Sequence, residues 1–187
     1  MTAAVDRPAA IRKALRDLVA ERGFHGASMG AVAKAAGVAA GTAYVHYESK
    51  EELVYATYLE SKAELGKAVF ADFDESAEPR DRWRHVLTTA YEHMSQEPGR
   101  ARFLSQLEES PYYEEAHSRL VAAGDPMAEI ATAEDLVALL VPLPGEVIYA
   151  LSFGVAVRLT AAGVQLKPEE LDLLVDATWR AVTTLSP

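Results

Sequence analysis

The hydrophobic residues of this chain recur mainly with the spacing of an α-helix. One helical face carries Ile11, Leu15, Leu18 and Val19, in a segment that ends at Gly23. A second apolar stripe, after the helix-start residue Pro168, comprises Leu171, Leu174, Val175, Thr178, Val182 and Leu185. The alternation typical of strands, bounded by hairpin turns, does not occur in the sequence. The pattern predicts an all-α fold of about nine helices.

Two short helices are predicted near the N-terminus. Ser28 is suited to cap a helix that runs to Ala36, and Gly37-Val38 then forms a tight turn before a second helix over residues 39–47. The next helix begins with a capping box, in which Ser49 bonds the Glu52 amide and Glu52 reaches back. Two short helices joined by a glycine-bearing turn form a helix-turn-helix, whose second helix enters the DNA major groove.

The same segment resembles the N-terminal domain of TetR-family transcriptional regulators. The run Ser28–Leu53, SMGAVAKAAGVAAGTAYVHYESKEEL, matches the family pattern A-x-x-A-G-V-x-x-G-T-x-Y followed by S-K-E-x-L. Arg22-Gly23-Phe24 is similar to the break that follows the first helix in this family, and the likeness covers about residues 8–60. The resemblance implies a three-helix DNA-binding domain, placed at residues 1–55, and a helical effector-binding and dimerisation domain at residues 56–187.

The resemblance also implies which residues contact DNA, mainly at phosphate oxygens. We expect these contacts from Ser28, Ala39, Ala40, Gly41, Thr42, Tyr44, His46, Tyr47 and Lys50. The alternatives are a Tyr44 ring packed under its helix and a Lys50 that is merely solvated. Ala39 and Ala40 stand where relatives commonly carry polar residues, and alanine cannot make bidentate bonds to a base. We therefore expect phosphate contacts and DNA shape to dominate recognition.

The family likeness further implies a pocket for a small effector in the second domain. We expect it to be lined by Trp83, Leu87, Tyr91, Phe103, Leu107 and Phe153, which by spacing alone also fit an ordinary core. The nearest cations in the sequence are Arg84 and Arg102. A neutral or cationic hydrophobic effector is therefore expected.

A helix over Val147–Val157 would be apolar nearly all round and must be covered on every side. Together with the stripe after Pro168 it fits a four-helix interface between two copies of the chain, as in the family. The predicted interface residues are Ile148, Leu151, Gly154, Val155, Leu171, Leu174, Thr178 and Val182. A charge at Gly154 or Leu174 is expected to give monomers or aggregate.

Composition and charge narrow the remaining possibilities. The chain has 187 residues, no cysteine and a net charge of −10. Residues 1–50 carry a net +3 and the remainder −13, so the basic excess lies in the segment that resembles a DNA-binding domain. The absence of cysteine excludes disulfides and a thiol nucleophile. The sequence shows no signal peptide or membrane-spanning run, and we expect a cytoplasmic protein with no membrane contact.

Enzymatic chemistry finds little support. His85 and His93 are eight residues apart, too far for a helical metal pair, and neither GxSxG nor a P-loop occurs. No catalytic residue, metal site or cofactor is therefore predicted. The expected function is a dimeric, ligand-responsive transcriptional regulator, a repressor released from a palindromic double-stranded DNA operator by an unknown small molecule. The alternative is an all-α ligand-binding or interaction protein with weak or lost DNA affinity.

Overall fold

The computed structural model describes residues 6–184 and confirms the all-α fold. Within this range the chain forms twelve helices and no strand. The helices are α1 (Arg7–Gly26), α2 (Met29–Ala35), α3 (Ala40–His46), α4 (Lys50–Phe70), α5 (Pro79–Gln96), α6 (Pro98–Glu108), α7 (Tyr113–Ala123), α8 (Pro126–Ala131), α9 (Glu134–Val137), α10 (Gly145–Leu151), α11 (Phe153–Ala161) and α12 (Pro168–Val182).

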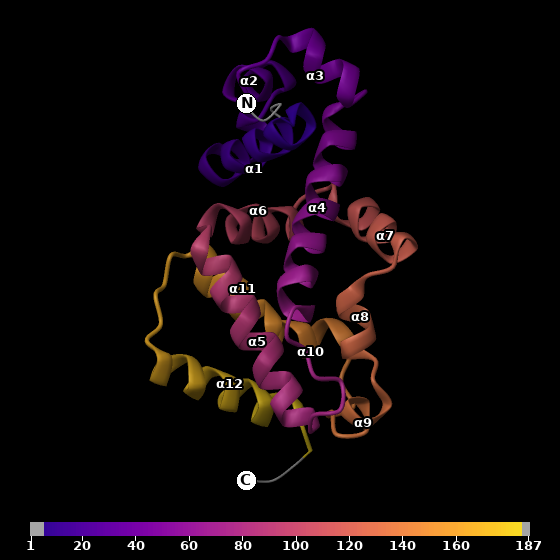
Figure 1. The fold of residues 1–187 in the computed structure, drawn as a ribbon, viewed down its shortest axis with the longest axis vertical. Coiled ribbons are helices and arrows are strands. Elements are labelled where there is room, and N and C mark those ends of the chain that lie inside the picture. Colours follow the sequence, from indigo (N-terminus) through magenta and orange to yellow (C-terminus); the bar gives the residue numbers. More distant parts are fainter. Residues whose placement is uncertain (1–5, 185–187) are drawn as a thin grey trace.

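The helices form two groups that share α4 (Figure 1). Helices α1, α2 and α3 lie at the N-terminal end of α4, at one end of the molecule, and the later helices make up the other group. Of these, α5, α7 and α8 pack directly against α4, and α7 reaches its first turn. Helix α6 lies against both α1 and α11, and so joins the two groups a second time. The position of α3 relative to the rest of the chain is thus set by α4 and by the contact between α1 and α6.

The helix starts follow from local chemistry. Side chains of Asp6, Ser28 and Ser49 accept bonds from backbone amides in the first turns of α1, α2 and α4. Proline opens α5, α6, α8 and α12, where its missing N–H costs no helical hydrogen bond. The predicted capping box at Ser49 is only half formed. Its hydroxyl accepts from the Glu52 amide (3.2 Å), but the Glu52 carboxylate bonds Arg119 of α7 instead (2.8 and 2.9 Å).

The predicted helix over Val147–Val157 is broken in the structure. It divides at Ser152, whose φ of −127° and ψ of −97° lie outside the helical region, into α10 and α11. The Ser152 hydroxyl donates to the carbonyl oxygen of Ile148 (2.6 Å), a local bond that competes with the helical backbone pattern. This break and the short helices α8 and α9 raise the number of helices in residues 6–184 above the nine expected.

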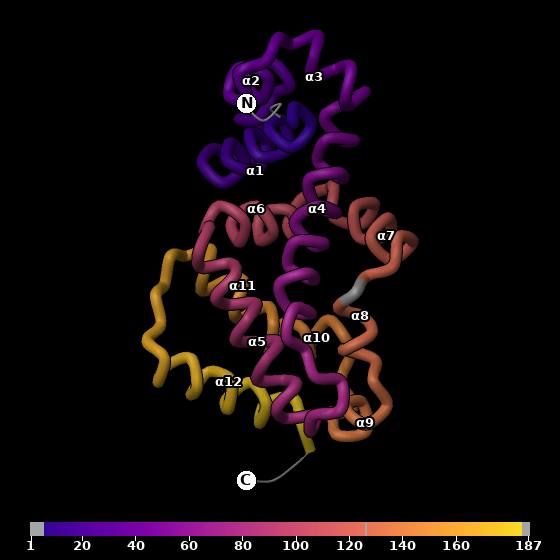
Figure 2. Tube along the Cα trace, in the orientation of Figure 1, coloured from indigo at the N-terminus to yellow at the C-terminus, as the bar shows by residue number. Residues whose placement is uncertain are grey.

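The C-terminal helix, α12, packs against α5 and not primarily against α11, which precedes it in the chain. The chain runs from α11 through a turn at residues 162–163 and the irregular segment 164–167 to α12, which lies against α5 (Figure 2). At the end of α12, a short antiparallel bridge joins Leu140 to Thr183, with a bond from the Val141 amide to the Val182 carbonyl oxygen (2.8 Å). This bridge fixes the end of α12 to the segment between α9 and α10.

Candidate nucleic-acid interface and internal cavity

Helices α2 and α3 form the predicted helix-turn-helix. Gly37 adopts a φ of +69° in the turn between them, a conformation that a residue with a side chain rarely adopts. The Val38 amide donates to the Ala33 carbonyl oxygen (3.0 Å) and closes the turn. Helix α3 is anchored to the core through Ala43, its one buried residue. The remaining side chains of α3 are therefore free to face outward.

Most of the predicted DNA contacts lie on this outward surface. Ser28, Ala39, Ala40, Gly41, Tyr44 and His46 are exposed, and Thr42 is half-buried. The Tyr44 side chain is 55% exposed, so its ring does not pack under the helix. Val45, which sequence reasoning did not select, is 82% exposed on the same short helix. An exposed valine next to Tyr44 offers an apolar surface of the kind that contacts a thymine methyl group.

Tyr47 is a core residue and not a surface contact. Only 9% of it is exposed, and its hydroxyl accepts a bond from Nη1 of Arg12 (2.6 Å). Burial raises the pKa of the Tyr47 hydroxyl, so it stays protonated at neutral pH. The prediction that Tyr47 faces DNA was wrong because this residue, the C-cap of α3, directs its side chain to Arg12 and to the Pro8 carbonyl oxygen of α1.

Lys50 also differs from the expectation of a free ammonium facing a phosphate. Its Nζ donates to the carbonyl oxygen of Phe24 and lies 6.0 Å from the ring centroid of Tyr112. Burial lowers the pKa of Lys50. The side chain thus links the start of α4 to the end of α1, and a DNA phosphate would have to compete with that carbonyl.

Most of the basic residues among the first fifty are already paired with carboxylates of the same chain. Ion pairs with carboxylates are formed by Arg12, Lys13, Arg16 and Arg22. Within residues 6–184, no carboxylate lies within 4.0 Å of Arg7 or Lys34, and both residues are exposed. These two cations, which sequence reasoning did not single out, are the ones most available to phosphates.

Two arginines of α1 connect it to the other helices. Arg12 donates to Glu60 of α4 (2.6 Å). Arg16 is only 4% exposed, and its guanidinium lies 3.9 Å from Glu60, 3.7 Å from Glu64 and 3.6 Å from Glu97. The position of α1 against α4 and the segment between α5 and α6 therefore depends on buried and partly buried charges.

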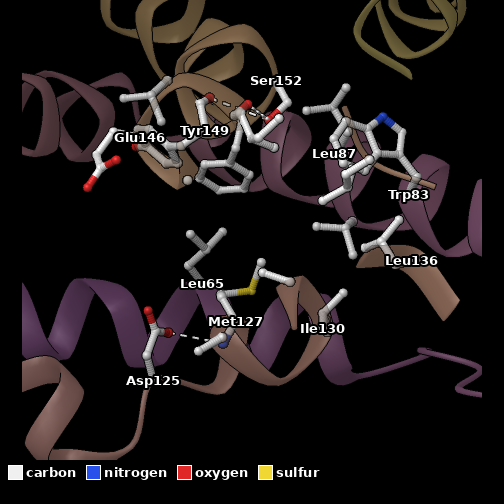
Figure 3. Close-up of a pocket in the computed structure, with 18 of the residues that line it drawn as sticks. Leu65, Trp83, Leu87, Asp125, Met127, Ile130, Leu136, Glu146, Tyr149 and Ser152 are labelled. Atoms are coloured by element: carbon white, nitrogen blue, oxygen red, sulfur yellow. Dashed lines mark hydrogen bonds between the residues drawn. The ribbon is translucent and has the colours of Figure 1, made fainter. Parts of the chain in front are cut away.

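The second helix group encloses a cavity of about 950 Å³. Its walls come from α4 through α11, and Tyr58, Lys62 and Leu65 line it from one face of α4. Apolar side chains predominate in the lining, and Figure 3 shows Trp83, Leu87 and Leu136 at one end. Asp125 and Glu146 lie at the opposite end. The cavity is thus apolar at one end and polar at the other, with the size of a small-molecule site.

Half of the predicted pocket residues line this cavity. Trp83, Leu87 and Phe153 do. Tyr91, Phe103 and Leu107 do not; all three are buried in the core, and the Tyr91 hydroxyl is held between the Val164 carbonyl oxygen (3.0 Å) and the Leu166 amide (2.7 Å). Helical spacing places all six predicted residues on inward faces of their helices. It does not distinguish a face that packs in the core from one that lines a cavity.

The cavity contains charges that were not anticipated. Lys62 and Arg82 both line it, and Arg82 is paired with Asp135. Tyr149 lines it too, and its hydroxyl donates to Glu108 (2.6 Å). The cations expected from their place in the sequence, Arg84 and Arg102, instead bond Asp172 and the carbonyl oxygen of Ala161. Lys62 could have been found from its spacing, because it follows Tyr58 by four residues and so lies on the same face of α4.

Helix α7 connects the cavity to the start of α4. Tyr113 and His117 of α7 line the cavity. Arg119, from the same helix, forms a bidentate pair with Glu52 in the first turn of α4 (2.8 and 2.9 Å). Tyr112 packs against Phe24 with ring centroids 5.1 Å apart. One short helix thus contacts the cavity, the end of α1 and the beginning of α4.

Some of the predicted dimer residues are buried within the chain, and others are exposed at its surface. Gly154, Leu171, Thr178 and Val182 are buried within the single chain; Ile148, Val155 and Leu174 are half-buried; Leu151 is exposed. The described part of the apolar stripe after Pro168 packs against α5 and α10 of the same chain, and its last member, Leu185, lies outside the described residues. The outer face of α12 carries Leu173, which is 67% exposed. A Cβ at Gly154 would lie 3.1 Å from the Tyr149 carbonyl oxygen, so a charge there disturbs the fold itself.

Within residues 6–184, no cluster of side chains could hold a metal ion. No helix among these residues has the length and apolar character needed to cross a membrane.

Comparison with known proteins points to one class. Residues 11–57 match the family model described as "Bacterial regulatory proteins, tetR family". An uncharacterized HTH-type transcriptional regulator of Haemophilus influenzae is 27% identical over 174 residues, which cover 88% of this chain and 89% of the relative. A TetR family transcription regulator from Marinobacter aquaeolei superposes with a TM-score of 0.81 at 23% identity over 95% of both chains. A TetR-family regulator from Haemophilus influenzae gives 0.77 at 25% identity, over 98% of this chain and 100% of that one.

Proposed function

Because the chain belongs to the TetR family of bacterial regulatory proteins and is a DNA-binding transcriptional regulator rather than an enzyme, we propose that it is a dimeric repressor released from its operator by a small molecule. The proposal divides the work between residues 1–55, which bind DNA, and residues 56–187, which bind the effector and a second copy. One observation carries it: α4 begins directly after the DNA-facing helix and lines the cavity with Tyr58, Lys62 and Leu65.

The outer surface of α3 is the part of the molecule best suited to the major groove. Thr42 and Tyr44 offer hydroxyls to phosphate oxygens, and Gly41 permits close approach of the backbone. Arg7 and Lys34, exposed on α1 and α2, add positive charge to the helix-turn-helix end of the molecule. With alanines at positions 39 and 40, few side chains read bases directly, and the shape of the operator supplies much of the specificity.

A ligand in the cavity has two routes to the DNA-binding helices. It contacts α4 directly, and it contacts α7, whose Arg119 holds the first turn of α4 through Glu52. A ligand that binds the DNA-free arrangement better than the DNA-bound one shifts the population toward release. The cavity thus provides the second site that an effector-controlled repressor needs.

A second copy of the chain is expected on the outer face of α12. Leu173 is the most exposed leucine among the described residues and lies there in line with Ala177 and Ala181. Two such faces related by a two-fold axis would bury apolar surface that is otherwise in water. The two α3 helices would then face half-sites about 34 Å apart, or a multiple of that distance.

A gel-shift titration with DNA from upstream of the protein's own gene tests the proposal. The wild type should bind this DNA in preference to a scrambled duplex, and the affinity should fall steeply with salt. A Thr42→Ala, Tyr44→Ala double variant should lose at least tenfold in affinity, whereas Val121→Ser, an exposed change on α7, should not. Equal binding by both variants would contradict the assignment of α3, and absence of sequence preference in the wild type would favour a ligand-binding protein that has lost its DNA affinity.

A further inference from the structure

The cavity holds a cation that the protein leaves without an ion-pair partner. Lys62 lines the cavity from α4, and within residues 6–184 no carboxylate lies within 4.0 Å of its Nζ. The other cation of the lining, Arg82, is paired with Asp135. Burial lowers the pKa of Lys62, which reflects the cost of keeping an ammonium in apolar surroundings. A ligand anion next to this ammonium would offset that cost.

The carboxylates near Lys62 already have other roles. Asp125 and Glu108 act on it at longer range and favour its charged form. Asp125 accepts from the Met127 amide (3.0 Å) and so caps α8, while Glu108 accepts from the Tyr149 hydroxyl (2.6 Å). Glu146, the third acid of the lining, is exposed, so water screens its charge. These acids do not supply a close partner for Lys62.

The opposite end of the cavity is suited to an apolar group. Trp83, Leu87 and Leu136 face one another there, away from Asp125 (Figure 3). Packing a hydrocarbon chain against these side chains would remove apolar surface from water and so favour binding. The distribution of apolar and charged groups along the cavity therefore matches a molecule with one apolar end and one polar end.

We propose that the effector is an amphiphilic carboxylic acid, whose carboxylate pairs with Lys62 and whose hydrocarbon part fills the end lined by Trp83, Leu87 and Leu136. This inference rests on the proposed function, since it names the class of molecule that occupies the effector cavity. It replaces the expectation of a neutral or cationic ligand, because Lys62 has no carboxylate within 4.0 Å among residues 6–184. Asp125 and Glu108 oppose a second anion at longer range, so the preference for an acid depends on direct contact between its carboxylate and Lys62. The hydroxyl of Tyr58, which lines the same face of α4 one turn earlier, is a further donor for the carboxylate.

A set of chain-matched probes tests the charge preference directly. Decanoate, 1-decanol and decylammonium have the same hydrocarbon chain and differ in the charge of the head group. Calorimetric titration of the full-length protein without DNA should show decanoate binding at least tenfold more tightly than either of the others. In a Trp179→Phe background, which removes the neighbouring indole, the emission of Trp83 should change over the same concentration range, since its indole lines the cavity.

Variants of two lysines on α4 then identify the group responsible. Lys62→Met should lose the preference for decanoate and bind decanol at least as well as the wild type, because an apolar side chain replaces an unpaired ammonium. Lys62→Arg should keep the preference. Lys67→Met, which removes an exposed lysine of the same helix, should behave as the wild type. Circular dichroism before each titration establishes that the variants are folded.

The outcomes separate this inference from the proposed function. Decylammonium binding more tightly than decanoate, or unchanged decanoate binding by folded Lys62→Met, would overturn the carboxylic acid assignment. In either case operator binding by the ligand-free protein would be untouched, and the repressor proposal would stand. If decanoate binds through Lys62 but no DNA is bound selectively, the ligand class holds and the proposed function fails.

Discussion

Two tyrosines separated by two residues differ in what each can do. Tyr44 faces outward from α3, whereas Tyr47 is buried and accepts a hydrogen bond from Arg12. The motif that places both near DNA does not distinguish them, because the distinction depends on α1, whose Arg12 lies 35 positions earlier in the chain. The local motif places both tyrosines at the end of a helix, but contacts with residues distant in the sequence determine whether each is buried or exposed.

The two tyrosines therefore predict opposite results for the same substitution. Tyr47→Phe removes a hydrogen bond from a charged donor and should lower the free energy of unfolding by about 1.5 kcal/mol. Tyr44→Phe should leave the free energy of unfolding within about 0.5 kcal/mol of the wild type but weaken DNA binding. Urea denaturation and gel-shift titration measure the two quantities, and equal destabilisation by both changes would contradict the difference in burial.

His93 predicts a pH dependence of stability. Its Nε2 lies 2.8 Å from Nη1 of Arg100, a bond that requires a neutral imidazole acceptor. Burial, and then the positive charge of Arg100, lower the pKa of His93 below 6.5, while Glu64 and Glu97 act in the opposite direction and Arg16 adds to the lowering. Between the lowered pKa and 6.5 the unfolded chain binds more protons, so stability should fall as the pH drops through this window.

Urea denaturation at pH 7.5, 6.5 and 5.5 measures this dependence. His93→Gln keeps an acceptor for Arg100 but cannot titrate, and the free energy of unfolding should decline less between these pH values than in the wild type. Identical slopes for the two proteins would show that His93 is not held neutral in the native state.

At the level of the helices, the sequence predicts the N-terminal part well and the remainder less completely. The caps at Ser28 and Ser49 and the turn at Gly37 are set by neighbouring residues, and the structure has all three. The break at Ser152 could not be derived in this way, since a serine followed by Phe153 and Gly154 does not by itself end a helix. Of the six residues predicted to line a pocket only Trp83, Leu87 and Phe153 do so, because the walls of the cavity come from eight helices, α4 through α11.

The charges between α1 and its neighbours give a prediction at this level. Arg16→Met removes the buried guanidinium that lies 3.6–3.9 Å from Glu60, Glu64 and Glu97. These carboxylates keep other partners, Arg12 for Glu60 and Arg100 for Glu64 and Glu97. Removing one partner of a buried ion pair costs roughly 3–5 kcal/mol, and we expect about 2 kcal/mol because the carboxylates are partly exposed and remain paired. Arg22→Met removes an exposed arginine of the same helix and should change stability by less than about 0.5 kcal/mol. Chemical denaturation of the two variants checks the difference, and a small effect of Arg16→Met would mean that this charge cluster does not hold α1 in place.

Assembly is the prediction that concerns the whole molecule. The wild type should sediment as a dimer at micromolar concentration. Leu173→Glu should give a folded monomer, because it places unpaired charges on the outer face of α12 without touching the core. Val121→Glu introduces the same charge at an exposed position on α7 and should leave the dimer intact. A monomeric wild type, or a dimeric Leu173→Glu variant, would exclude this interface.

The continuity of α4 has a mechanical consequence. From Lys62 to the start of the helix at Lys50 is twelve residues, or about 18 Å of rigid rod. A tilt of about 10° at the cavity would displace the end that carries α3 by about 3 Å. A two-fold axis doubles this displacement, so the separation of the two recognition helices would change by about 6 Å against a groove repeat of about 34 Å. Hydrogen bonds to phosphates do not survive a shift of that size. Under the proposed function, a lever arm of this length would let a ligand that moves a few atoms by an ångström release the dimer from its operator.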